Sequence, residues 1–313
     1  MVPRKRRDWR TILWAAAMPV AISAQYARPS LIPFLLPMTC YLALAAGVIA
    51  HNHNHCPTFS NRRANRFFGN WLSLFYGYPT FAWVPTHNLN HHRYVNRAGD
   101  ATITWRHTNR HTLPVALGYF FVSSYWQADP IRQYIRKART QDRPLYRRVR
   151  FQYGLWATTA VGLLALAVAV HGAWGGLALW FVVSVVPAVF ALWTIMLFNY
   201  EQHLHADPWS EHSHSRSWTS PLLNFLLFNN GYHAAHHEYP STHWSELPEK
   251  HAPLARLIHP DLVEGSLLWY FAKNYVLAPF VPRFGSTQIG RAPFDPPDGS
   301  TPNTATADIQ LVG

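Results

Sequence analysis

Four apolar runs, separated by polar stretches that contain many histidines, dominate the pattern of the chain. They cover approximately residues 11–26, 30–50, 151–170 and 176–198. Roughly 20 apolar residues are needed to cross the hydrocarbon core of a membrane, and membrane helices tolerate prolines such as those in these runs. Only short connections separate the first run from the second and the third from the fourth. The pattern therefore predicts four transmembrane helices in two hairpins.

Three further apolar stretches are too short to cross a membrane. They span residues 71–85, 113–126 and 267–280, and the first two are rich in aromatic side chains. Such segments are typical of helices that lie along a membrane interface. From residue 285 onward the sequence turns to Pro, Gly, Thr and Asp without periodicity. We therefore expect a membrane-embedded domain over residues 1–284 and a disordered tail over residues 285–313.

The basic residues predict how the helices are oriented. Five of them, from Arg4 to Arg10, precede the first apolar run, and a second cluster lies directly before the third run. Arg28 is the only lysine or arginine in the two short connections between the apolar runs. Because positive charge accumulates on the cytoplasmic side, both termini and the middle region are expected to be cytoplasmic. The basic start resembles a signal peptide, but the second apolar run follows without an obvious cleavage site, so we expect an uncleaved first helix.

Composition supports a membrane protein and points to a metal site. Hydrophobic residues make up 49% of the chain and charged residues 13%. The net charge of +12 would suit nucleic acid, but the basic residues lie between apolar runs and not on a separate module, so no nucleic-acid partner is expected. Of 19 histidines, only His171 lies outside the predicted cytoplasmic segments, and none lies within a span. This placement argues against a membrane b-type cytochrome and a midplane metal transporter.

Histidines recur at spacings that suit metal ligands on helices. His51 and His55 share one helical face, and a further pair, Asn199 and His203, follows the fourth apolar run. The other two clusters are His87, His91 and His92, and His233, His236 and His237. Neutral imidazole suits iron, copper, zinc and nickel, so the residue type does not name the metal. Nine histidines are too many for one centre but enough for two metals at the cytoplasmic boundary.

The other histidines carry weaker signals. His53 lies within the first cluster but points away from its partners on a helix, and we treat it as uncertain. Isolated histidines are usually surface or capping residues, and this is the expectation for His107, His111, His171, His212, His214, His243, His251 and His259. His107 and His111 share an HxxxH spacing and are the strongest rivals. A carboxylate-bridged di-iron bundle is disfavoured because Glu-x-x-His occurs once, at Glu211 to His214.

The order of these motifs, HxxxH, HxxxHH, NxxxH and HxxHH, resembles the membrane fatty acid desaturase and hydroxylase superfamily, and bacterial fatty acid desaturases in particular. The third cluster with its Asn229–Pro240 surroundings is similar to the desaturase version. The resemblance implies four spans below a cytoplasmic helical cap that holds a non-haem di-iron centre. The ligands that it implies are His51, His55, His87, His91, His92, His203, His233, His236 and His237, with Asn199 acting through water.

The resemblance also implies the chemistry. Breaking an unactivated C–H bond requires an oxidant that no side chain supplies, so two irons and O2 would carry it. We expect desaturation of a fatty acyl chain; a membrane di-iron hydroxylase is the main alternative and a zinc-dependent membrane hydrolase a weaker one. The substrate would be a lipid or an acyl thioester in a bacterial inner membrane.

A separate electron donor of the ferredoxin or cytochrome b5 type, with its reductase, is expected because the chain contains no His-Pro-Gly-Gly haem motif. Four acids near the histidine clusters are candidates for orienting imidazoles: Asp100, Glu201, Asp207 and Glu238.

Overall fold

The structure, a computed structural model, describes residues 2–297, which are mostly helical and divide into two compact units. The first unit consists of residues 2–83 and 135–195, and the second of residues 84–134 and 196–297. Two helices, α5 (Leu113–Gln141) and α7 (Val186–His203), contribute residues to both units. Each unit is described separately below.

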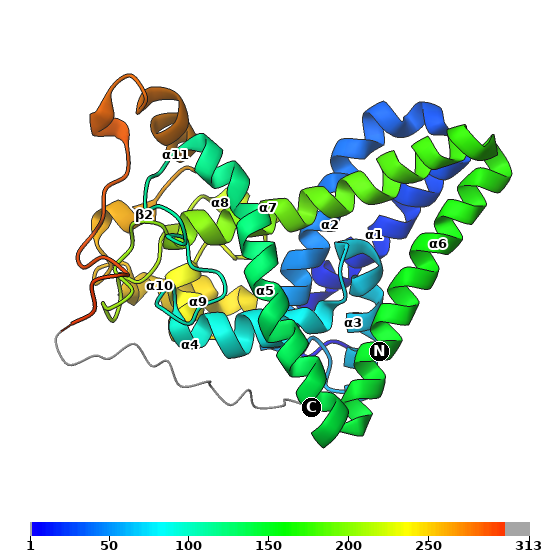
Figure 1. The fold of residues 1–313 in the computed structure, drawn as a ribbon, viewed down its shortest axis with the longest axis horizontal. Coiled ribbons are helices and arrows are strands. Elements are labelled where there is room, and N and C mark those ends of the chain that lie inside the picture. Colours follow the sequence, from blue (N-terminus) through cyan, green and yellow to red (C-terminus); the bar gives the residue numbers. More distant parts are fainter. Residues whose placement is uncertain (1, 298–313) are drawn as a thin grey trace. The chain divides into compact units, whose positions relative to one another are not determined.

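The first unit begins with a helical hairpin. Helices α1 (Asp8–Ala27) and α2 (Ile32–His55) lie side by side, and α3 (Arg62–Tyr76) packs against α2 (Figure 1). Within the hairpin, the Gln25 side-chain amide donates to Thr39 Oγ1 at 2.7 Å. Because these polar groups are buried, their hydrogen bond removes a desolvation cost and holds the hairpin in register.

The longest helical segment of the first unit reverses direction at a glycine. Helix α6 (Arg143–Trp180) contains Gly172, whose φ of 75° and ψ of 171° lie outside the helical region and allow the chain to turn back. Beyond the turn, the Trp180 indole donates to the carbonyl of Ala160 at 3.0 Å. A Cβ at Gly176 would collide with the Val168 backbone, so the two arms approach closely because this residue is small. A π-helix, Phe181–Val185, then leads into α7.

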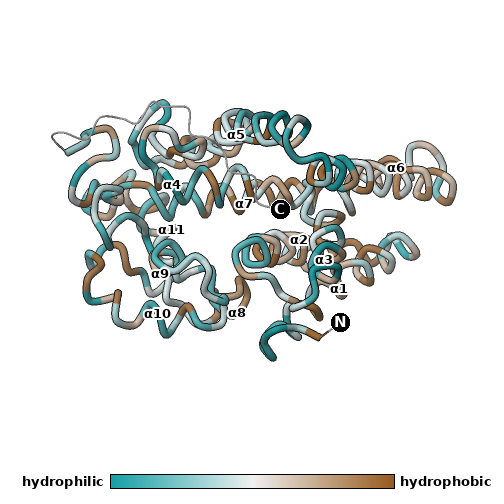
Figure 2. Tube along the Cα trace, turned by 90° about the horizontal axis from the view of Figure 1, so that it is seen from below, coloured by the Kyte–Doolittle hydropathy of each residue, from teal (hydrophilic) through white to brown (hydrophobic). Residues whose placement is uncertain are grey.

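Two helical stretches among the described residues are long and apolar enough to cross a membrane: Pro29–His55 and Arg143–His203. The second has 61 residues and contains both predicted spans on either side of Gly172. Figure 2 shows hydrophobic residues along α6. The predicted first span lies in α1, which is not one of these two stretches. These findings agree with a membrane protein, while the arrangement of four spans remains a prediction.

The second unit consists of short helices and loops around two very short strands. Its elements include a π-helix at Val84–His91, α4 (His92–Tyr94), α8 (Pro221–Leu226), α9 (His233–Glu238), α10 (Leu247–Leu254) and α11 (Leu267–Phe271). Strand β1 (Ser217–Trp218) pairs in parallel with β2 (Val263–Glu264). The structure is mostly helical, in agreement with the predicted all-α fold class, and two-residue strands are too short to show the alternating pattern that would have predicted them.

Small apolar residues place α9 against the core of the second unit. Ala234 and Ala235 are buried and pack with Leu247, Leu254 and Leu262. Their small side chains let α9 lie close to α10. The three histidines of the third sequence motif flank these alanines on the same short helix, at His233, His236 and His237. Packing of the alanines therefore determines the direction in which these imidazoles point.

Two of the short apolar stretches belong to longer elements. The stretch 113–126 is the start of α5, which has 29 residues because Ala, Arg and Gln residues extend the helix beyond the apolar part. The stretch 71–85 begins in the last turns of α3, which stops at Gly77 in the left-handed conformation, and continues through a 3-10 helix, Thr80–Ala82, into the π-helix Val84–His91. The stretch 267–280 forms α11 and a π-helix, Ala272–Leu277. The apolar residues alone therefore did not mark the helix boundaries.

The described part of the predicted tail is hydrogen-bonded to the second unit. The Ile289 amide donates to the His205 carbonyl at 2.9 Å, and the Ser286 amide donates to Asn274 Oδ1 at 2.8 Å. The remainder of the predicted tail, 298–313, lies outside the described residues.

Candidate metal centre

The second histidine motif is wound as a π-helix that passes into an α-helix. In a π-helix, hydrogen bonds join residue i to residue i+5, so residues five apart come onto one side. His87 and His92 have this spacing, and their Nε2 atoms lie 3.1 Å apart. His91 and His92 are neighbours in sequence, but their ring planes are inclined at 77° and their centroids lie 6.0 Å apart. The winding therefore separates two adjacent histidines into different clusters.

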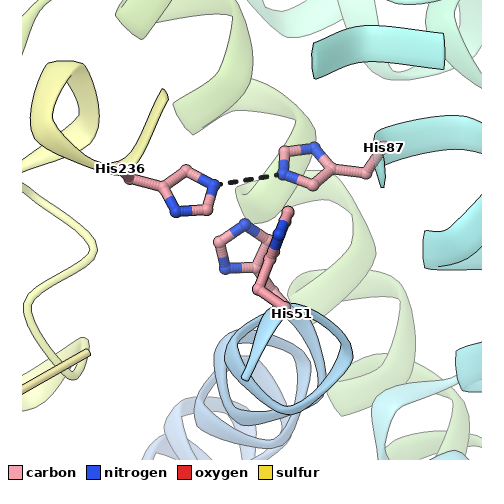
Figure 3. Close-up of side chains that lie close together, drawn as sticks. His51, His87 and His236 are labelled. Atoms are coloured by element: carbon pink, nitrogen blue, oxygen red, sulfur yellow. Dashed lines mark hydrogen bonds between the residues drawn. The ribbon is translucent and has the colours of Figure 1, made fainter. Parts of the chain in front are cut away.

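The first imidazole cluster of the second unit consists of His87, His92 and His236. The His236 Nε2 atom lies 3.0 Å from that of His92 and 3.4 Å from that of His87. Figure 3 shows the contact between His87 and His236 as a dashed line. A neutral imidazole has one nitrogen lone pair, and lone pairs that face one another require a proton or a cation between them. Three Nε2 atoms that converge in this way suit a metal ion.

The second imidazole cluster contains four histidines whose potential ligand atoms all lie within 4.8 Å of one another: His91, His203, His233 and His237. The His233 Nε2 atom lies 2.9 Å from that of His203 and 3.1 Å from that of His237. The Nε2 atom of His91 is buried, and no group among residues 2–297 forms a hydrogen bond with it. A buried nitrogen without a partner is costly in a protein but is what a metal ligand requires. The residues of this cluster therefore fit a metal.

Asp100 holds the imidazole of His91 from the other side. Its Oδ2 atom lies 2.8 Å from His91 Nδ1, and the Thr102 hydroxyl lies 3.0 Å from the same nitrogen. Burial raises the pKa of the Asp100 carboxyl, but the His91 imidazole and the hydrogen bonds from His91 and Thr102 outweigh it and bring the pKa to about 2. An ionised carboxylate at Nδ1 keeps the proton on that atom, which leaves Nε2 available to a metal.

Two other members of the second cluster, His203 and His237, are also suited to binding a metal. His203 Nδ1 donates to the backbone carbonyl of His214 at 3.2 Å, so its Nε2 atom faces His233 with a free lone pair. Burial and the surrounding imidazoles hold the pKa of His237 well below its usual range. A neutral ring is the form that binds a metal.

A glycine places the third motif next to these residues. Gly231 donates from its amide to Asn224 Oδ1 at 3.1 Å, and its carbonyl accepts from the Trp218 amide at 2.8 Å. A Cβ at this position would collide with the Trp218 carbonyl and the Asn224 side chain. The close approach therefore requires glycine two residues before His233.

His51 and His55 belong to the first unit, at the end of α2. Their ring centroids lie 4.9 Å apart, and His51 also contacts the ring of Trp83 at 5.1 Å. Both therefore occupy one face of the helix, as their spacing predicts. His53 faces elsewhere: its Nδ1 atom lies 2.9 Å from Thr58 Oγ1, and its Nε2 atom lies 3.2 Å from the Asn65 carbonyl. Both of its ring nitrogens have partners within the protein.

Asn199 lies one turn before His203 on α7. Its side-chain amide donates to the Tyr119 hydroxyl at 3.0 Å and approaches the Thr102 carbonyl at 3.5 Å. Thr102 also contacts His91, so Asn199 lies beside residues that support the second cluster. Its predicted contact with a metal through water remains a prediction.

The four candidate acids have different surroundings in the described part of the chain. Of the four, Asp100 contacts a candidate ligand, while Glu201 accepts hydrogen bonds from Tyr270 at 2.9 Å and from Tyr275. Asp207 accepts from the Trp209 and Arg291 amides, and Glu238 contacts His212 and His214. Only long-range folding distinguishes these acids, so the sequence could not rank them.

Two histidines that the sequence predicted to be surface or capping residues, His111 and His214, have largely buried side chains. The His111 Nε2 atom lies 2.7 Å from the Tyr275 hydroxyl and 3.1 Å from Glu201 Oε2. The ring centroid of His214 lies 5.3 Å from that of His237. The HxxxH spacing was the only available signal for His111, and its partner His107 is exposed. His243 and His259 cap short helices, as expected for isolated histidines.

Comparisons with known proteins bear on this site. A family described as fatty acid desaturase matches residues 27–269. The chain is 26% identical over 250 residues to the sphingolipid delta(4)-desaturase/C4-monooxygenase of Rattus norvegicus, covering 74% of this chain and 68% of the relative. It is 26% identical over 245 residues to the sphingolipid delta(4)-desaturase of Gallus gallus, with the same coverage. No solved structure matches the chain significantly.

Proposed function

Since the chain belongs to the fatty acid desaturase family and is an oxidoreductase, we propose that it uses two histidine-bound irons and O2 to introduce a double bond into a fatty acyl chain. The observation that carries this proposal is the pair of imidazole clusters in the second unit, one with His91 and one with His92. Two all-imidazole clusters supply ligands for two metals, and iron is one of the metals that such ligands suit.

The proposed ligand set goes beyond the second unit. We propose that His51 and His55 also bind metal, because the order of the histidine motifs in the family resemblance includes them. Asn199 would contribute through a water molecule. Iron bound at these ligands would pass electrons from the separate donor to O2, and O2 would supply the oxidising power that removes two hydrogens from the substrate.

The protein's own residues would prepare this chemistry. Asp100 and the His214 carbonyl fix the tautomers of His91 and His203, so their Nε2 atoms remain deprotonated. Burial of these rings excludes water from the ligand atoms, and burial also holds the pKa of His203 well below its usual range. A separate electron donor and a lipid or acyl-thioester substrate complete the proposed reaction.

The mass of the product tests this function. Membranes that contain the protein, given a labelled acyl substrate, a reducing partner and O2, should form a product two mass units lighter, because desaturation removes two hydrogens. Mass spectrometry of the extracted lipids measures the change, and membranes without the protein are the control. A product sixteen mass units heavier would contradict desaturation.

Hydroxylation is the second candidate function. One observation favours it: the name of the relative from Rattus norvegicus includes a C4-monooxygenase as well as a desaturase. The same imidazole ligands suit both outcomes, so the heavier product in the experiment above would support the hydroxylase. A zinc-dependent hydrolase would instead yield neither product and would not consume O2.

We further propose that the protein crosses the membrane several times, with both termini and the histidine motifs in the cytoplasm. A reporter fused after Gly313 should be active only on the cytoplasmic side, because the basic residues flank the predicted spans on that side. A second fusion at His171 should report the outer side. A C-terminal reporter found outside would contradict the proposed orientation.

A further inference from the structure

The end of α7 that carries His203 is closed by side chains from two distant segments. A helix leaves the last four carbonyls without partners inside the helix. Here the carbonyls of Glu201 and Leu204 accept from the Arg216 guanidinium, and the carbonyl of Gln202 accepts from the Arg216 amide at 2.6 Å. The carbonyl of His203 accepts from the Asn96 side-chain amide at 3.1 Å.

Arg216 is suited to this position by its charge and shape. Only 2% of its surface is exposed, and its guanidinium lies 4.9 Å from the centre of the Tyr270 ring. A positive charge at the C-terminus of a helix interacts favourably with the helix dipole. One guanidinium nitrogen, Nη1, donates to both carbonyls while the planar group lies over the Tyr270 ring, and the ammonium group of lysine does not reproduce this contact with the ring.

Asn96 connects the same helix end to the second histidine motif. Its φ of 63° is left-handed, a conformation that asparagine tolerates better than most residues. The backbone amide of Asn96 donates to Asp100 Oδ2 at 2.8 Å, and Asp100 orients His91. Its side chain also accepts from the Thr104 amide at 2.8 Å. Asn96 is therefore hydrogen-bonded both to Asp100, which orients His91, and to the backbone carbonyl of His203.

We infer that Asn96 and Arg216 are positioning residues of the metal centre, which act by fixing the end of α7 and thereby the imidazole of His203. The guanidinium of Arg216 has no lone pair to offer a metal, and the Asn96 side chain bonds the His203 carbonyl and the Thr104 amide. Their effect passes through backbone carbonyls, so the loss of one should displace His203 without removing it. The inference rests on the proposed metal centre.

Substitution of Asn96 by glycine tests the contribution of the side chain while the backbone conformation is kept. Glycine adopts the left-handed conformation without strain, so Asn96→Gly removes chiefly the hydrogen bonds to His203 and Thr104. We expect the affinity for Co²⁺, used alone as the probe, to fall about 10–100-fold, as is typical when residues behind metal ligands are changed. The visible absorption of bound Co²⁺ should also shift, because it depends on ligand geometry.

Asn229→Gly is the matched control. Asn229 is also left-handed, with a φ of 60°, and its side chain also donates to a backbone carbonyl, that of Trp244 at 3.0 Å. This bond holds no candidate ligand, so Co²⁺ affinity and absorption should remain those of the wild type. Arg216→Lys keeps the charge and should still weaken Co²⁺ binding, because an ammonium group lacks the planar contact with the Tyr270 ring that helps to hold the guanidinium at these carbonyls.

A double-mutant cycle tests whether Asn96 acts through His203. In protein that already carries His203→Ala, adding Asn96→Gly should change Co²⁺ affinity less than about threefold, because there is no ligand left to position. Full additivity, or unchanged Co²⁺ binding in Asn96→Gly, would overturn this inference alone. Wild-type protein that binds no Co²⁺ and no iron would overturn the proposed metal centre and this inference together.

Discussion

Replacing His91 with alanine should release most of the iron from the second imidazole cluster and lower the oxidation rate by more than about 100-fold. The expected loss exceeds the 10–100-fold typical of residues behind the ligands, because His91 offers its buried Nε2 atom directly. The measurement is iron per chain in purified protein together with product formation. Wild-type protein should contain about two irons per chain if both clusters are filled.

A buried histidine outside the clusters provides the control for this experiment. His243 is 3% exposed, and its Nδ1 atom lies 2.9 Å from the Ser245 hydroxyl. His243→Ala removes a similar buried ring, and the folded protein should keep its iron. Iron content near the wild-type value in His91→Ala, or stoichiometric zinc in protein produced with ample iron, would contradict the proposed centre.

Removal of the Asp100 carboxylate should destabilise the protein even without metal. In Asp100→Ala, the Asn96 amide and the Thr102 amide and hydroxyl lose a buried acceptor, as does His91 Nδ1. Breaking a buried charged contact from one side costs about 3–5 kcal/mol, because its partners remain buried. The free energy of unfolding of the metal-free protein should fall by about this amount, measured by denaturation in detergent.

Asp100→Asn distinguishes stability from metal binding. Its side-chain oxygen still accepts hydrogen bonds, so most of the stability should return, but one buried oxygen becomes an amide donor. If that amide faces His91 Nδ1, the proton on this nitrogen is no longer favoured, and iron affinity should fall about 10–100-fold. Equal stability of Asp100→Ala and wild type would show that the hydrogen bonds around Asp100 contribute little.

The sequence predicted the members of the clusters better than their grouping. His233, His236 and His237 lie on one short helix, and local spacing was enough to select them. The approach of His203 to His233 joins residues 30 positions apart and depends on the fold between them. Local spacing also could not reveal that Asp100, among four nearby acids, contacts His91.

The fold shows the same division between local and long-range information. The turn within the second predicted hairpin was expected from the very short connection, 171–175, between two apolar runs, and Gly172 interrupts the helix there. The pairing of β1 with β2 joins Ser217 to Val263, and two residues carry no detectable period. Helix boundaries followed capping residues such as Asn61 and Gly77 more closely than they followed hydrophobicity.

Because Val84–His91 is a π-helix, the relative positions of His87 and His92 depend more on the number of residues between them than on which residues these are. Each residue advances an α-helix by about 100°. Deleting one residue between His87 and His92 would keep their imidazoles together only if the segment rewound as an α-helix, in which residues four apart share a face. Substitutions at the intervening positions do not change this count. During evolution, point substitutions here should be accepted far more often than insertions or deletions.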